Sequence, residues 1–157
     1  MNGSTLLKFN RAASAVWHGF YRKGEFMIHS GATATLTHRV AAQDLASAFG
    51  NDTDEKYPDV MSTPAMLGLM ERACAEIMRG ELEDGQLSVG VTTQLTHSAP
   101  TPVDAQVSAT ASFRRREGNL FVFDVVVHDP KGQVGSGTHA RAVVDRTVIE
   151  KRAASRR

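Results

Sequence analysis

The chain has 157 residues, of which 41% are hydrophobic and 22% are charged, an ordinary composition for a globular protein. This length suits one domain with a substantial core, because a domain of about 150 residues buries roughly 68–70% of its unfolded surface. The single cysteine, Cys74, excludes an internal disulfide framework and a cysteine-based zinc site. No segment approaches the roughly 18–20 consecutive apolar residues of a membrane-spanning helix, so no membrane partner is expected.

The formal net charge of +1 combines regions of opposite sign. Residues 1–30 hold four basic residues and one acidic residue, and residues 146–157 hold five and one. Residues 31–145, between them, hold nine basic and fifteen acidic residues. Because nucleic-acid affinity depends on clustered bases, this acidic central part predicts no nucleic-acid partner.

The first 30 residues form a distinct region in which apolar and aromatic residues alternate with bases, and no acid precedes Glu25. This composition fits either an amphipathic targeting segment or an accessory segment that packs on the body or on a partner. We favour the accessory segment and a cytoplasmic protein. The predicted organisation is an N-terminal extension over 1–30, one domain over 31–150 and a basic tail over 151–157.

The first regular element is a strand near 33–40, where Ala34, Leu36 and His38 alternate with polar residues. A short helical turn is expected over 44–49, and a polar loop follows over 50–58.

A long helix is predicted from about Pro64 to Arg79. Thr63 is the expected N-cap, Pro64 suits the first helical position and Gly80 suits the C-terminal stop. At about 100° per residue, the apolar side chains fall within one arc roughly 120° wide. The helix should therefore be buried along much of its circumference. The residues of this arc are Met66, Leu67, Met70, Cys74, Ile77 and Met78.

Four alternating strands follow, over about 86–99, 103–116, 119–129 and 132–148, with turn residues between them. Long strands joined by short turns favour an antiparallel sheet. The pattern predicts an α+β fold in which the helix packs on one face of a curved sheet. The glycines within 132–137 lack the Lys-Ser/Thr of a phosphate-binding loop and indicate a twisted or bulged strand.

Two ionisable residues stand out against apolar surroundings. Glu71 lies at the edge of the helical arc, either paired with a base or held for a specific chemical role. His97 shares strand parity with Leu87, Val89, Val91, Thr93 and Leu95, so we expect it to face the helix. It is either a satisfied core histidine or, together with Glu71, part of an acid/base site. Gly90, on the opposite parity, is either a bulge or a point where a substrate approaches backbone N–H groups.

Thr63 needs no explanation beyond capping, although its hydroxyl would lie at the positive end of a helix, where negative charge is stabilised. The six histidines show no i,i+4 pairing, and the sequence predicts no metal site.

Three blocks, in order, extend this picture: Met61–Cys74, Ser88–Val91 with Leu95–Pro102, and Gly135–Val143. Together they resemble hot-dog-fold thioesterases of the fluoroacetyl-CoA thioesterase type, over about residues 31–150. The resemblance implies a long central helix wrapped by a curved antiparallel sheet. It also implies a homodimer with active sites at the subunit interface, a coenzyme A ester as substrate and no cofactor.

The resemblance places the family's catalytic residues at Thr63, Glu71 and His97. It places the backbone-donor glycine at Gly90, the arginine near the CoA or acyl entrance at Arg141 and the gating aromatic of a lid at Tyr57. Pro64 and Ala65 replace residues that shape the family's acyl pocket, and residues 1–30 have no counterpart. The resemblance therefore supports hydrolysis of a short or small acyl-CoA without supporting selectivity for fluoroacetyl.

The expected mechanism has His97 as general base on water or on Thr63, with Glu71 orienting one of them. The helix N-terminus and nearby backbone N–H groups would stabilise the oxyanion. The alternative is a non-catalytic acyl-CoA-binding or structural dimer. A hot-dog hydratase ranks third, because no Asp-x-x-x-x-His block is present.

Because residues 31–145 are acidic overall, binding of the negatively charged coenzyme A phosphates requires basic side chains close to the phosphates. Arg114, Arg115 and Arg116, with Arg141 and the basic ends, are the predicted candidates.

Overall fold

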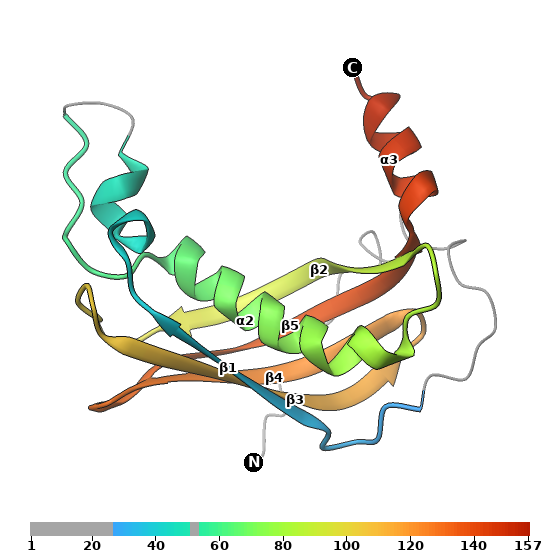
Figure 1. Ribbon diagram of the computed structural model, residues 1–157, viewed down its shortest axis with the longest axis horizontal. Helices are drawn as coiled ribbons and strands as arrows, with labels where there is room; N and C mark the ends of the chain where they lie inside the picture. The colour runs from blue at the N-terminus through green and yellow to red at the C-terminus, as the bar shows by residue number, and fades with distance from the viewer. Residues whose placement is uncertain (1–26, 51–53) are drawn as a thin grey trace, which may run out of the picture.

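The structure, a computed structural model, describes residues 27–50 and 54–157. The predicted N-terminal segment therefore lies largely outside the described residues. Within the described residues, one five-stranded antiparallel sheet runs in the order β1-β3-β4-β5-β2 (Figure 1). The strands are β1 (Thr33–Arg39), β2 (Gln86–His97), β3 (Gln106–Glu117), β4 (Leu120–Asp129) and β5 (Gly132–Asp145). These strands confirm the predicted α+β, hot-dog architecture.

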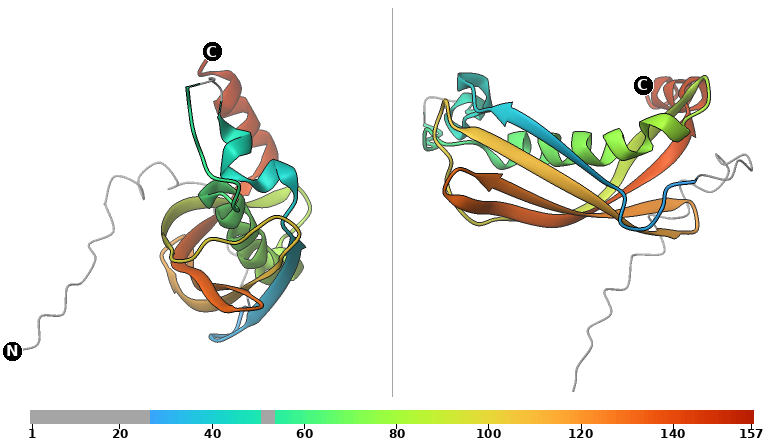
Figure 2. Two further views of the ribbon diagram at one scale, coloured as in Figure 1. Left: turned by 90° about the vertical axis from the view of Figure 1, so that its left-hand side faces the viewer. Right: turned by 60° about the horizontal axis from the view of Figure 1, so that its bottom comes forward.

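The helix α2 (Thr63–Met78) lies in the hollow of the sheet, which curves around it (Figure 2). Its apolar side pairs with the inward side chains of β3 and β4 to form the main core. The predicted span of 64–79 is confirmed to within one residue. The buried residues of α2 are Met66, Leu69, Met70, Ala73, Cys74 and Met78.

Short 3₁₀ turns flank the helix, at Ala42–Asp44 and Ala46–Phe49 before it and at Arg79–Glu81 after it. The glycine-rich stretch of β5 is confirmed as strand. A Cβ at Gly137 would lie 2.3 Å from the Gln94 carbonyl oxygen, so this close strand contact requires glycine.

The C-terminal end differs from the sequence prediction. The last strand was expected to reach residue 148, but α3 (Arg146–Ala154) begins directly after β5. The reason is a cap: Asp145 Oδ1 accepts hydrogen bonds from the backbone N–H groups of Thr147 and Val148. This helix rises from the sheet at the end opposite to the start of α2 (Figure 1).

Within the described residues, no helix is both long and apolar enough to cross a membrane.

Candidate active site

The N-terminus of α2 is held in place by the chain on both sides of it. The Met61 N–H donates to the Thr101 carbonyl, and the Ser62 N–H donates to the Asp44 carbonyl, each at 2.8 Å. Ser62, not Thr63, is the N-cap, because its Oγ accepts the Ala65 N–H at 3.2 Å. The prediction that Thr63 caps the helix is wrong, and Thr63 is instead its first helical residue.

Thr63 and His97 form a direct pair. Thr63 Oγ1 lies 3.1 Å from His97 Nδ1, a hydrogen bond between the start of α2 and the end of β2. The other ring nitrogen, His97 Nε2, is buried and has no hydrogen-bond partner among the described residues. The pair therefore combines a hydroxyl, a base and a ring nitrogen with unused hydrogen-bonding capacity.

Glu71 lies elsewhere on the same helix. It comes eight positions after Thr63, which is about 12 Å along the helix axis. Its carboxylate is 38% exposed and lies against Gly90 and Arg141, with Oε2 3.6 Å from an Arg141 guanidinium nitrogen. Within one chain, the five residues form two separate groups, Thr63 with His97 and Glu71 with Gly90 and Arg141.

A bulge in β2 changes which side chains share a face. The register against β5 shifts between Gly90 and Thr92, because Val91 is an extra residue. Val91 accordingly packs with the cluster of Leu120, Val122, Ala140 and Ala142, away from the main core. The prediction that Leu87, Val89 and Val91 share a face with His97 is therefore wrong.

Gly90 consequently faces the helix, as His97 does. A Cβ there would lie 2.9 Å from Glu71 Oε1 and 3.0 Å from His139 Cε1. The Gly90 backbone thus lies between a carboxylate and an imidazole, and a Cβ there would force these side chains to shift.

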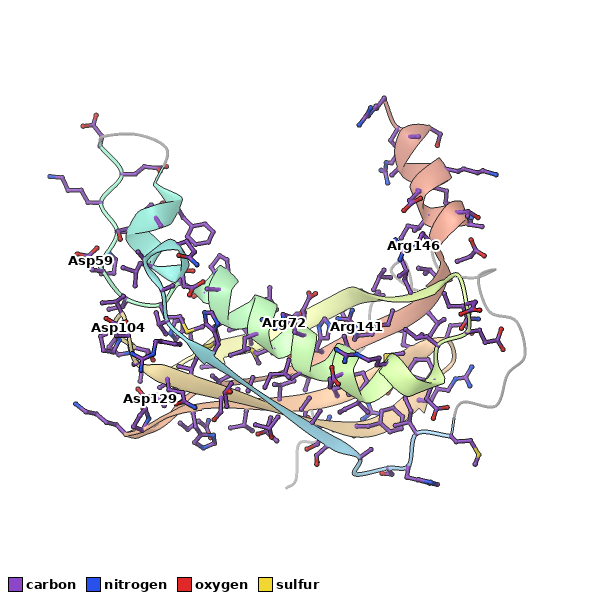
Figure 3. All side chains as sticks on the ribbon, viewed as in Figure 1. Asp59, Arg72, Asp104, Asp129, Arg141 and Arg146 are labelled. Atoms are coloured by element: carbon purple, nitrogen blue, oxygen red, sulfur yellow. The ribbon has the colours of Figure 1, made fainter. Side chains whose placement is uncertain are left out.

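Arg141 is a buried base on β5 that points from the sheet toward α2 (Figure 3). It is 6% exposed, and burial lowers its pKa while the Glu71 carboxylate opposes that change. Its guanidinium donates to Ser88 Oγ at 3.1 Å, to the Ser88 carbonyl at 2.8 Å and to the Glu71 carbonyl at 3.3 Å. Arg141 therefore lies inside the fold, bonded to protein acceptors.

A cavity of about 460 Å³ adjoins Thr63. Tyr57, the predicted gating aromatic, is one wall of it and is 51% exposed; Phe49 is another exposed aromatic there. The remaining walls are Ala46, Glu55, Ser62 and Pro64.

The three arginines predicted for the CoA phosphates lie at the end of β3, and each has a protein partner. Arg114 pairs with Asp124 through Nε and one outer nitrogen, and Arg115 pairs with Glu117. Arg116 donates to the Gly118 carbonyl at 2.9 Å. The strand register aligns Arg116 with Gly90 across the sheet. Three strand spacings separate the two residues, which is about 14 Å along the sheet.

Sequence reasoning missed two residues of this region. His139, 2% exposed, bonds both Thr93 and Arg141, and burial together with the Arg141 charge lowers its pKa. Its position two residues before Arg141 on one strand could have placed both on the same face. Asp44 accepts His38 Nε2 at 2.6 Å and the Ala41 N–H at 2.8 Å. Although burial opposes it, these bonds lower the pKa of Asp44.

The comparisons with known proteins agree with this fold. The family model of the fluoroacetyl-CoA-specific thioesterase FlK matches residues 40–147. The chain belongs to this family. The membership confirms the predicted resemblance and the predicted class of enzyme, a thioester hydrolase.

Individual relatives point the same way. The fluoroacetyl-CoA thioesterase of Streptantibioticus cattleyicolor is 43% identical over 89 residues, which span 57% of this chain and 64% of that protein. A solved structure of the fluoroacetyl-CoA thioesterase FlK is 32% identical, with a TM-score of 0.78 over 82% of this chain and 97% of that one. A variant of FlK solved with fluoroacetate and CoA aligns at 34% identity and TM-score 0.73, over 77% and 98%.

A hot-dog-like protein from Thermanaerovibrio acidaminovorans is 30% identical, with a TM-score of 0.70 over 81% of this chain and 91% of that one.

Proposed function

We propose that this protein hydrolyses the thioester of a short or small acyl-CoA, as a cytoplasmic homodimer, with Thr63, His97 and Glu71 as catalytic residues. The observation that carries the proposal is the hydrogen bond between Thr63 Oγ1 and His97 Nδ1 beside a cavity. A hydroxyl bonded to an imidazole is the usual arrangement of an activated oxygen nucleophile. The family membership supplies the thioester, and a relative that holds fluoroacetate and CoA supports an acyl-CoA ligand.

The pair can complete a full hydrolytic cycle. His97 Nδ1 takes the Thr63 proton as Oγ1 attacks the thioester carbonyl carbon; the C–S bond breaks and the imidazolium protonates the thiolate. Water then attacks the acyl ester with His97 again as base, which releases the acid and restores Thr63. The same base would serve direct attack by water. Burial raises the pKa of Cys74 to about 12, so its thiol is unsuited to be the nucleophile.

Glu71 enters this scheme through a second copy of the chain. It lies about 12 Å along α2 from Thr63 in its own chain, too far for a carboxylate side chain to reach. Among the described residues β2 forms one edge of the sheet, and an edge strand can pair with its own copy. Antiparallel pairing centred between Thr93 and Gln94 would set Gly90 opposite the partner subunit's His97.

In that dimer, Glu71 would accept a hydrogen bond from Nε2 of the partner subunit's His97. This ring nitrogen is buried and has no partner within the described chain. A carboxylate there would hold the imidazole in the tautomer that lets Nδ1 act as base. The catalytic set would then comprise Thr63 and His97 from one subunit and Glu71 from the other.

The oxyanion donor follows from the same arrangement. The start of α2 offers few N–H groups, because Ser62 Oγ accepts the Ala65 N–H and Pro64 has none. We assign the donor to the backbone N–H of Gly90 from the partner subunit. The absence of a Cβ there lets a carbonyl oxygen approach the backbone.

The test is thiol release from acyl-CoA esters that vary in chain length and α-substituent. The proposal expects turnover that depends on both His97 and Glu71. Near-wild-type turnover in His97→Ala and in Glu71→Gln would overturn the residue assignment. Saturable binding of acyl-CoA without thiol release, indifferent to His97→Ala, would instead identify a non-catalytic binding dimer.

A further inference from the structure

His139 is a deeply buried imidazole near Glu71, and the mechanism above gives it no part. It lies on β5 and is 2% exposed. Its Nδ1 is 2.7 Å from Thr93 Oγ1, and its Nε2 is 3.1 Å from an outer nitrogen of Arg141. Both ring nitrogens are therefore within hydrogen-bonding distance of a protein partner.

These partners determine where the ring proton lies. An arginine side chain only donates hydrogen bonds, so Nε2 of His139 must accept with its lone pair. The proton is then on Nδ1, which donates to Thr93 Oγ1. Protonation of Nε2 would direct an N–H at the guanidinium. Burial, with the positive charge of Arg141, lowers the pKa of His139 and keeps the ring neutral.

The His139 ring also lies against the two residues that adjoin Glu71, namely Arg141 and Gly90. The Arg141 nitrogen that His139 accepts from also donates to the Glu71 carbonyl and is the one nearest the Glu71 carboxylate. Between the two ring nitrogens, His139 Cε1 lies 3.0 Å from where a Gly90 Cβ would stand. One imidazole thus fixes the direction of the guanidinium and supports the backbone of the glycine.

We propose that His139, as the neutral Nδ1–H imidazole, is a positioning residue that orients Arg141 and thereby places the Glu71 carboxylate and the Gly90 backbone for thioester hydrolysis. This inference rests on the proposed function. His139 touches no substrate, and its effect passes through Arg141 and Gly90.

A matched pair of variants separates its two hydrogen bonds. The amide of Asn overlies the Nδ1 side of the ring, so His139→Asn keeps the bond to Thr93 and loses the acceptor for Arg141. The amide of Gln reaches the Nε2 side, so His139→Gln keeps a carbonyl acceptor for Arg141. Thr93→Val retains the shape of Thr93 and removes the hydroxyl that accepts the hydrogen bond from Nδ1–H.

The measurement is kcat and KM for thiol release, per folded protein as determined by circular dichroism at the assay temperature. We expect kcat to fall about tenfold or more in His139→Asn, since a hydrogen bond to a charged group is lost, with KM within about twofold. His139→Gln should retain most of the activity, and Thr93→Val should lie between. Equal losses in the Asn and Gln variants, or a rise in KM alone, would overturn the proposal, as would an unchanged Thr93→Val.

A second measurement does not need activity. Nitrogen-15 NMR of the histidine rings in the wild-type protein should show His139 as the Nδ1–H tautomer at pH 7. An Nε2–H tautomer or an imidazolium would contradict the inference. If the wild type releases no thiol from any ester, the proposed function fails and the ring tautomer alone decides this inference.

Discussion

The two groups of site residues differ in how firmly the fold holds them. Thr63 and His97 meet through one hydrogen bond, and Thr63 is exposed beside a cavity. Near the middle of α2, Arg141 is buried and donates to acceptors on the helix and on two strands. Because a buried charge is costly to leave unpaired, the second group contributes to stability as well as to geometry. Substitutions in the first group should change the catalytic rate alone, and substitutions in the second group should change both the catalytic rate and the stability.

The largest effect on rate is expected at His97. His97→Ala removes the proposed general base and should lower kcat for thiol release by about 10²–10⁴-fold. The urea midpoint should change less than for a core substitution, because His97 makes a single hydrogen bond within its own chain. His128→Ala, at an exposed position on β4, is the matched control and should retain wild-type activity. A loss of stability equal to that of a core substitution would remove the distinction between the two groups.

Gly90→Ala tests the second group. Its new Cβ would lie 2.9 Å from Glu71 Oε1 and 3.0 Å from His139 Cε1, so those side chains must shift. We expect a loss of about 1–3 kcal/mol in the free energy of unfolding and at least about a tenfold fall in kcat.

Gly68→Ala is the control for that variant. Gly68 is exposed within α2, and a Cβ there would meet no atom within 4 Å. Alanine should stabilise the helix by about 0.5–1 kcal/mol. If Gly90→Ala behaved like Gly68→Ala, the close packing around Gly90 would be refuted.

Acid should weaken the second group through His139. The pKa of His139 in the folded protein is lowered below its usual 6.5, so the unfolded chain binds the proton first. The neutral His139 ring makes its full contribution to the free energy of unfolding above pH 6.5, and this contribution decreases as the pH falls below 6.5. The slope is at most about 1.4 kcal/mol per pH unit.

Urea unfolding at pH 7.5, 6.5 and 5.5, at one chain concentration, measures this loss. His139→Gln removes the titrating ring and should flatten the slope relative to wild type. The exposed His128→Gln should leave the slope unchanged. If the free energy of unfolding fell with pH at the same slope in the wild type and in His139→Gln, the His139 ring would not be held neutral.

The smallest effect is expected for the arginines of β3, outside both groups. Neutralising Arg114, Arg115 and Arg116 together should raise KM for acyl-CoA more than it lowers kcat, and added salt should act in the same direction. The change should be a few-fold, because Arg114 and Arg115 already pair with carboxylates. An unchanged KM in both tests would direct the search for the phosphate site to the basic C-terminal helix.

The sequence predicts the parts of this molecule that depend on local pattern. Pro64 and Gly80 bracket the helix, and alternation locates the strands to within a few residues. Gly90 suggests a bulge as one of two alternatives, but the position of the extra residue, Val91, depends on how β2 pairs with β5. Ser62 and Thr63 both carry a capping hydroxyl, and contacts with Asp44 and Thr101 decide between them.

The C-terminal helix escaped prediction for a related reason. Thr147, Val148 and Ile149 are β-branched and favour strand, but the Asp145 cap ends the strand before them.

The central claim is that one active site takes Thr63 and His97 from one subunit and Glu71 from the other. The direct test mixes two inactive chains, Thr63→Ala and Glu71→Gln, by co-expression or by refolding together. A mixed dimer would hold one intact site, so an equal mixture should recover about one quarter of wild-type thiol release. If all three residues acted within one chain, every chain in the mixture would carry a defect. Activity no higher than that of the separate variants would contradict the account.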